Sequence, residues 1–239
     1  MVFRKIALAK FALFGALALS LSGCFDLTQS VWLNKGGAGH YDMTIAATGA
    51  FGEALRQGKS DVHVGHNPNL PTRTKTVIAN GKTFQTTVVD FKQLSDLALS
   101  NESVAVKVRG HDLFGLGSTH AVFRRIFFVD NEMKKRQRGD SGQNDEEAGK
   151  AILASMFGDH TYVFRVHLPG SIDWIAPVYA GDIEVKPDIR AEDGGYTISW
   201  AMPLTDMMET KTMRFSVGFS AWGGINDSET QRDDRQGTD

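Results

Sequence analysis

A β-hairpin can be read from residues 74–89, TKTVIANGKTFQTTVV. Asn80-Gly81 lies between two runs rich in β-branched residues, Thr74 to Ile78 and Thr83 to Val89. Asn-Gly is favoured in two-residue hairpin turns because both central positions need a positive φ. The stretch therefore predicts two antiparallel strands, and it indicates that short hairpins build the fold.

Alternating apolar and polar residues predict further strands on both sides of this hairpin. Upstream, Thr28 to Asn34 and Tyr41 to Ala47 flank the glycine-rich segment 36–39, which predicts a first hairpin. The downstream strands are expected at Ser103 to Arg109, His120 to Val129, Thr161 to Leu168, Ile183 to Ile189, Tyr196 to Met202 and Thr212 to Trp222. Most neighbouring strands are close enough in sequence to pair antiparallel.

Short helices are expected in three places. One covers Ala50 to Gln57, and a second follows Asp90 as its N-cap, with an apolar stripe at Leu94, Leu97 and Ala98. The third runs from about Asp145 to Phe157. The predicted fold class is α+β, a predominantly antiparallel β-sheet with two or three short helices packed on one face.

The first residues of the chain have the pattern of a bacterial export signal. Three basic residues, Arg4, Lys5 and Lys10, precede an uncharged run that extends from Phe11 to Leu21. That run is shorter than the roughly 20 apolar residues that a membrane-spanning helix needs. We therefore expect residues 1–23 to be a signal peptide that is cleaved.

Leu21-Ser22-Gly23-Cys24 is similar to a lipobox, in which an apolar residue and two small residues precede the acylated cysteine. Cys24 is the only cysteine in the chain, so no disulfide partner exists for it. We expect Cys24 to be the lipidation site, carrying palmitate or related acyl chains, and three chains on one residue make anchoring effectively permanent. The alternative is a chance cysteine after an ordinary secretory signal.

The remaining sequence is divided into a domain at residues 24–225 and a polar tail at residues 226–239, which has no apolar residue and is expected to be disordered. The signal peptide contains three of the 26 basic residues and none of the 28 acidic ones, so the mature chain has a net charge of minus five. A nucleic-acid partner would favour a basic surface, and none is expected.

The expected location is the extracytoplasmic or periplasmic side of the cell membrane or outer membrane, reached through the lipid anchor. In enteric-type sorting, an Asp directly after the lipidated cysteine favours the inner membrane. Phe25 occupies that position here, and Asp26 comes one residue later. This favours the outer membrane where the host has one.

No pattern in the sequence predicts a catalytic, metal or cofactor site. Gly139-Asp140-Ser141-Gly142 is similar to the serine motif of chymotrypsin-like proteases, but it lies in a very polar segment, whereas a nucleophile needs a rigid surround. His63 and His66 have a metal-like spacing without a defined third ligand. Gly37 to Gly39 and Gly115 to Gly117 are too short for phosphate loops and are expected to be turns.

Two further sets of residues have both a functional and a structural interpretation. The basic run Lys134 to Arg138 would attract anionic lipid, but Asp140 and the acidic residues at 145–147 offset it, which favours a solvated loop. The large aromatic side chains would suit a lipid-lined cavity, although alternating positions favour ordinary core. These side chains are Trp174, Trp200, Trp222, Phe215 and Phe219.

Several pieces of the chain together resemble the LppM-like envelope lipoproteins. They are the lipobox followed by a strand and a glycine-rich turn with Tyr41, the Asn-Gly hairpin with Phe84, Phe164 to Gly170, and Tyr196 to Trp200. The resemblance implies a lipid-anchored, non-enzymatic domain of mixed α/β structure, associated in that family with binding envelope glycolipids and with trafficking or assembly at the cell surface. Family members often have a C-terminal membrane helix or basic tail, which is not expected here. The family supplies no ligand residues.

The leading hypothesis is a non-catalytic, membrane-anchored protein that binds an envelope lipid or amphiphile, or another envelope component, in an apolar groove between sheet and helices. One rival is a structural or assembly partner of a membrane protein complex, acting through sheet edges or the charged loop around Lys134. The other rival is a hydrolase whose His and Asp groups converge only in three dimensions.

Overall fold

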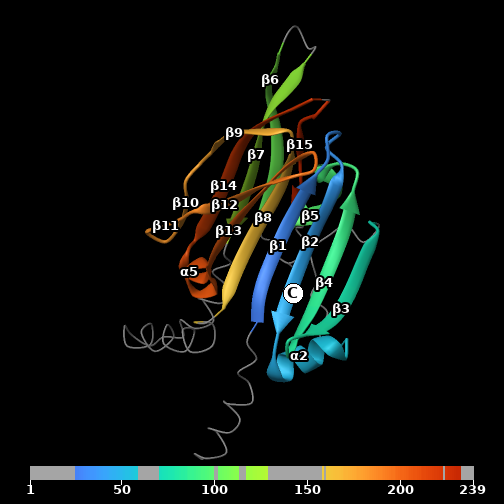
Figure 1. Ribbon diagram of the computed structural model, residues 1–239, viewed down its shortest axis with the longest axis vertical. Coiled ribbons are helices and arrows are strands. Elements are labelled where there is room, and N and C mark those ends of the chain that lie inside the picture. Colours follow the sequence, from blue (N-terminus) through green and yellow to red (C-terminus); the bar gives the residue numbers. More distant parts are fainter. Residues whose placement is uncertain are drawn as a thin grey trace, which may run out of the picture.

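A computed structural model describes residues 25–58, 70–99, 102–112, 117–128, 158, 160–222 and 224–232. Two β-sheets dominate it (Figure 1). The larger sheet contains seven strands, in the spatial order β12 (Pro187–Glu192), β13 (Gly195–Pro203), β8 (Thr161–Pro169), β1 (Phe25–Leu33), β2 (Gly39–Ala47), β4 (Lys82–Phe91) and β3 (Thr72–Ala79). The smaller contains five, in the order β15 (Ser228–Glu229), β6 (Glu102–His111), β7 (Ser118–Phe128), β14 (Thr212–Trp222) and β9 (Ser171–Ile175).

The two hairpins expected in the first half of the chain are confirmed. β1 and β2 pair antiparallel around the turn at residues 34–38, and β3 and β4 pair antiparallel around Asn80-Gly81. Asn80 has a φ of 50° and Gly81 a φ of 75°, the left-handed geometry that favours this dipeptide. Because the turn sets the register, Ile78 lies opposite Thr83.

The seven-stranded sheet is mixed rather than purely antiparallel. β1 pairs parallel with β8, with Val31 opposite Val166, and the other pairs in this sheet are antiparallel. The parallel pair joins the N-terminal hairpin to β8, β13 and β12 from the second half of the chain (Figure 1). Both halves of the sequence therefore contribute to one continuous sheet.

Two α-helices occur in the described part of the chain, and neither lies across the face of a sheet. α2 (Gly49–Arg56) confirms the helix expected there and packs at the end of β2 and β4, whereas α5 (Leu204–Glu209) follows β13 directly. The fold is α+β, but the expected packing of helices on one face is wrong, because the second sheet covers that face. The helix expected after about Asp145 lies outside the described residues. No described helix has the length and apolar character needed to cross a membrane.

The helix expected after Asp90 is also wrong. β4 continues to Phe91, and only a 3₁₀ turn, η1 (Leu94–Asp96), follows before the short strand β5 (Ala98–Leu99). Asp96 Oδ2 accepts hydrogen bonds from the backbone N–H groups of Lys92 and Gln93 at 3.0 Å each, and these bonds hold the chain in a single 3₁₀ turn. Asp90 remains within β4, paired with Arg73 of β3.

The polar tail is ordered over its first half, so the expectation of disorder from Asn226 onward is wrong up to Arg232. β15 pairs with β6, and β16 (Gln231–Arg232) pairs with β5. Polar side chains order this segment by binding the strand backbone: Asp227 accepts the N–H of Val108 at 2.6 Å, and Thr230 Oγ1 accepts that of Val104 at 3.0 Å. Residues 233–239 lie outside the described residues.

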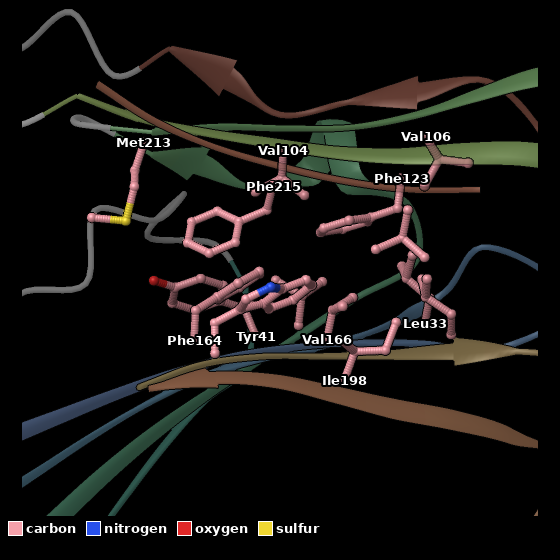
Figure 2. Packing of buried hydrophobic residues seen from close by; sticks show 14 of the residues in the cluster. Leu33, Tyr41, Val104, Val106, Phe123, Phe164, Val166, Ile198, Met213 and Phe215 are labelled. Carbon is pink, nitrogen blue, oxygen red and sulfur yellow. The ribbon is translucent and has the colours of Figure 1, made fainter. Parts of the chain in front are cut away.

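The core lies between the two sheets, whose inner side chains meet face to face (Figure 2). Phe164 of β8 packs against Trp200 of β13 and Phe215 of β14, with ring centroids 5.8 and 4.6 Å apart. The apolar cavity beside Leu33 and Phe219 has a volume of about 10 Å³, room for about one water. The described interior is therefore filled by its own side chains.

Candidate functional site

Most sequence motifs that suggested chemistry lie outside the described residues. This holds for Cys24, the expected lipidation site, for His63 and His66, for Lys134 to Arg138, and for the segment Gly139 to Gly142. Gly37 and Ala38 lie in the β1–β2 turn, as expected, and Gly39 begins β2. Within the described ranges, no three His, Cys, Asp or Glu side chains are arranged to hold a metal ion.

The five large aromatic residues are divided between the core and the surface. Trp200, Phe215 and Phe219 are fully buried, as the core interpretation predicts. Trp174 is 47% exposed and Trp222 is 70% exposed, so the core interpretation is wrong for these two. Trp222 follows Ala221 in a strand whose odd-numbered residues face inward, and Trp174 lies on the edge strand β9.

The exposed tryptophans flank a polar cluster on the outer side of the five-stranded sheet. We call this region the Trp174–Trp222 surface, and its members are Asp112, His120, Asp173, Trp174, Ser220 and Trp222. β7 and β14 place His120 directly opposite Ser220, and β9 places Ser171 opposite Ser220 on the other side. Three adjacent strands therefore carry five of these six residues, and Asp112 follows the end of β6.

The Trp174 indole covers a position that has no side chain. A Cβ atom built on Gly218 would be 2.2 Å from Trp174 Nε1, so the indole occupies the space that any other residue would fill. Trp222 is four residues further along β14, about 13 Å at the usual rise of a strand. The two rings therefore lie at the two ends of the polar cluster.

Hydrogen bonds link the members of the polar cluster. Ser220 Oγ lies 2.6 Å and 2.7 Å from the two carboxylate oxygens of Asp173, to which it donates, and 2.8 Å from His120 Nδ1. His120 Nε2 lies 3.0 Å from Asp112 Oδ1. Hydrogen bonding to Asp112, then to Asp173, raises the pKa of His120 above its ordinary value. The imidazole is thus stabilised as a cation between two carboxylates.

A second polar group is buried between the sheets, at Arg125 of β7. This side chain has no solvent exposure, and its Nε donates to Glu102 Oε2 while Nη2 donates to Gln29 Oε1. Nη1 donates to the Tyr162 hydroxyl at 2.6 Å, and Tyr41 donates to Glu102 Oε1 at 2.8 Å. All five side chains are buried, and each is hydrogen-bonded to another member of this network.

Burial sets the ionisation of this network. It raises the pKa of Tyr162 to about 12, and it raises the pKa of Tyr41 well above its ordinary value. The Arg125 guanidinium also lies over the Phe164 ring, 4.1 Å from its centroid. With one cation, one carboxylate and neutral phenols, the network joins the sheets but offers no opening to a ligand.

On the outer side of the seven-stranded sheet, Trp32 lies between two histidines. Its ring stacks on His40 and His167 at centroid distances of 5.5 and 4.6 Å. Burial lowers the pKa of His167 in spite of the nearby Glu192 carboxylate. Trp32 itself is half-buried, so this stack exposes less aromatic surface than the Trp174–Trp222 surface does.

Comparisons with known proteins add little beyond a partial likeness of fold. No protein-family model and no curated protein matches the sequence. One similar solved structure is the folded domain of LppM from Mycobacterium tuberculosis, at 10% identity over 84% of this chain and 93% of that one, with a TM-score of 0.38. Another is an M1 zinc metallopeptidase from Deinococcus radiodurans, at 12% identity over 81% of this chain but 41% of that one, with a TM-score of 0.27.

Likenesses at these TM-scores assign neither a ligand nor an activity to this chain. A function for this chain is therefore inferred from its own residues.

Proposed function

We propose that this chain is a lipid-anchored, non-catalytic envelope protein that binds a polar, hydroxyl-bearing envelope component at the Trp174–Trp222 surface. This proposal rests on the pair of exposed tryptophans at the two ends of a hydrogen-bonded Asp, His and Ser cluster. Exposed aromatic side chains with satisfied polar neighbours are typical of binding surfaces.

The binding surface lies outside the core. The apolar groove between sheet and helices expected from the sequence is not found in the described residues: the open hollow between α2 and the β3–β4 turn, about 300 Å³, is lined largely by polar side chains, Thr48, Glu53, Arg56 and Thr83. The apolar cavity between the sheets, about 10 Å³, is too small for an acyl chain. This favours recognition of a polar group at the surface over enclosure of a lipid tail.

The chemistry of the surface suits a ligand with hydroxyl groups and an apolar ring face. Each indole presents a flat apolar face together with one N–H donor. Asp112 and Asp173 accept hydrogen bonds, and the His120 ring N–H donates them. Because His120 and Asp112 keep 42% and 53% of their side-chain surface exposed, both can contact a ligand that approaches from solvent.

Anchoring follows from the sequence before the domain. Residues 21–24 form the lipobox pattern, and Cys24 is the only cysteine of the chain. Acylation of Cys24 would hold the domain at a membrane and restrict its partners to molecules of the envelope. The anchor and the Trp174–Trp222 surface are separate features, so they can be tested separately.

The test compares binding by full-length protein in nanodiscs to two fractions of the host envelope, its lipids and its cell-surface polysaccharides. Trp174→Ala and Trp222→Ala should each weaken binding by about 2 kcal/mol, roughly 30-fold, as for tryptophans at the centre of an interface. Tyr179→Ala is the matched control, because Tyr179 is 52% exposed on β10 (Val178–Ala180), outside the cluster. Equal binding by all four proteins would contradict the proposal.

We do not propose catalysis, although Ser220, His120 and Asp112 are linked in the order of a nucleophile, a base and an orienting acid. A base must take the proton of the serine. His120 lies between two carboxylates that favour its protonated form, and Ser220 already donates to Asp173. A fluorophosphonate probe should therefore leave Ser220 unlabelled, whereas stoichiometric labelling would favour the hydrolase.

A second function is favoured by the edge of the seven-stranded sheet. All eight residues of β3 are exposed, and within the described part of the chain β3 pairs on one side only, with β4. Such an edge can accept a strand from a partner protein. Crosslinking in cells from an introduced photoreactive residue at Lys75 would give one discrete protein adduct if the chain assembles with a membrane complex.

A further inference from the structure

The anchor and the domain are separated by no linker. Cys24 immediately precedes Phe25, the first residue of β1. Consecutive Cα atoms are 3.8 Å apart. If Cys24 is acylated, as proposed above, the end of the sheet at which β1 begins must therefore lie next to the bilayer surface.

The strand register identifies the other residues at that end. Phe25 lies opposite Ala47 of β2, Ala47 lies opposite Thr83 of β4, and Thr83 lies opposite Ile78 of β3. α2 begins directly after this row, and its Phe51 contacts the Phe25 ring with centroids 5.7 Å apart. In Figure 1, α2 lies at the same end as the beginnings of β1 and β4.

This end of the sheet is apolar and carries balanced charges. Ile78 is 60% exposed and Val77 is 42% exposed, and Phe51 of α2 is half-buried against Phe25. The cations of this end are paired: Lys82 binds Asp26 at 2.9 Å, and Arg56 binds Glu53 at 2.5 Å. Among the described residues of this end, therefore, no net charge opposes the approach of a lipid surface.

The other side of the same end differs in charge. α5 begins where β13 ends, next to the beginning of β8, since the N–H of Leu204 donates to the carbonyl of His160. Its acidic residues, Asp206 and Glu209, would be repelled by anionic phospholipids. The contact with the membrane should therefore be made by α2 and the β3–β4 turn rather than by α5.

We propose that the end of the seven-stranded sheet formed by α2 and the β3–β4 turn rests on the bilayer, with Ile78 within the lipid headgroup layer. This inference depends on acylation of Cys24. The described surface at Ile78 is then covered by lipid of the membrane that holds the anchor.

In this orientation, the Trp174–Trp222 surface lies far from that membrane. β1 spans eight steps from Phe25 to Leu33, roughly 26 Å at the usual rise of a strand. Leu33 lies beside Phe219 and Ile225 across the small apolar cavity, so the end of β14 that carries Trp222 is at the distal end of β1. The component bound by the Trp174–Trp222 surface is thus one that projects well above the anchoring membrane.

The test uses the full-length lipoprotein in vesicles of phosphatidylethanolamine and phosphatidylglycerol. Acylation consumes the Cys24 thiol, so an introduced cysteine can be labelled alone with a polarity-sensitive NBD dye. Ile78→Cys carries the dye at the proposed contact. Lys35→Cys is the matched control, at an exposed position in the β1–β2 turn at the opposite end of the same sheet.

We expect NBD emission at position 78 to shift to shorter wavelength on reconstitution and to be quenched at least threefold more by doxyl-labelled lipid than emission at position 35. Equal, solvent-like emission at both positions would overturn the orientation. Vesicle flotation separates the two claims: protein that does not float has lost the anchor, whereas protein that floats with solvent-like dye at 78 refutes only the contact. An unchanged near-ultraviolet circular dichroism spectrum verifies that each variant is folded.

Discussion

Replacing Arg125 by methionine tests whether the buried network joins the two sheets. The guanidinium is completely buried and binds Glu102, Gln29 and Tyr162. Methionine keeps much of the volume but removes the charge and all of these donors. The Glu102 carboxylate would remain between the sheets with the Tyr41 hydroxyl as its remaining partner in this network.

Breaking a buried ion pair by removing one partner costs about 3–5 kcal/mol, because the other charge is left uncompensated. For a chain of this size, each kcal/mol lowers the melting temperature by about 2–4 °C, so the expected decrease is roughly 6–20 °C. Replacing the pair together, as Arg125→Met with Glu102→Leu, should recover much of this loss, because no unpaired charge remains.

The assay is urea unfolding of the mature chain with Cys24→Ser, followed by near-ultraviolet circular dichroism of the buried Trp200. Arg124→Met is the matched control, because Arg124 is exposed on the opposite face of the same strand. We expect Arg124→Met to change the free energy of unfolding by less than about 0.5 kcal/mol. If Arg125→Met is no more destabilising than this control, the inference that the network joins the sheets is refuted.

Three further predictions concern the turn at Gly170, the C-terminal strands and the buried tyrosines. Gly170→Ala should destabilise the fold by more than 1 kcal/mol in the same urea assay, because Gly170 has a φ of 83° and an added Cβ would lie 2.0 Å from the Ser220 carbonyl oxygen. Truncation after Gly224 should lower the melting temperature in calorimetry, because it removes the bonds of Asp227 and Thr230 to β6. Stability should decrease as the pH rises above about 10, because the Tyr162 phenol stays neutral to a pKa of about 12 in the folded chain while the unfolded chain ionises earlier.

Each of these has its own control. Gly36→Ala should be neutral, because nothing lies within 4 Å of its added Cβ and no positive φ is required. Truncation after Arg232 keeps β15 and β16 and should leave the melting temperature unchanged. Tyr162→Phe should flatten the alkaline decrease in the free energy of unfolding, and an equally steep decrease in that variant would show that other groups cause it.

Local patterns in the sequence predict most of the long strands, but the single strand expected at Ile183 to Ile189 is wrong: β11 (Ile183–Val185) and β12 lie in separate sheets. Period-two alternation places Phe164, Val166 and Leu168 on one face of β8, and all three are buried. Asn80-Gly81 predicts its turn because few other dipeptides favour two successive positive φ values. Such signals are local, so they identify strands and hairpins without stating which distant strands will pair.

The sheet arrangement and the Trp174–Trp222 surface depend on pairings between distant parts of the chain. The parallel pair of β1 and β8 brings Val31 next to Val166, and β7, β9 and β14 bring His120, Asp173 and Ser220 together. No spacing within the sequence indicates these contacts. The exposure of Trp222 had a local signal, since it falls on the even-numbered, outward positions of β14.

The same parity argument places Arg125 on the inner face of β7, beside Phe123 and Phe127. A buried arginine requires an acceptor, and this requirement alone predicts a partner in the core. The identity of that partner, Glu102, comes from the pairing of β6 with β7, in which Glu102 lies opposite Phe127. Sequence reasoning therefore indicates that a buried network is needed but does not identify its members.

The most direct test of the account is the intact mass of the protein purified from membranes of its host. Acylation and cleavage predict a chain that begins at Cys24 and carries a thioether-linked diacylglycerol, with or without a third acyl chain on its amino group. A Cys24→Ala variant should then leave the membrane fraction. A mature chain whose Cys24 thiol is free, or a variant that stays in the membrane fraction as the native protein does, would contradict the central claim.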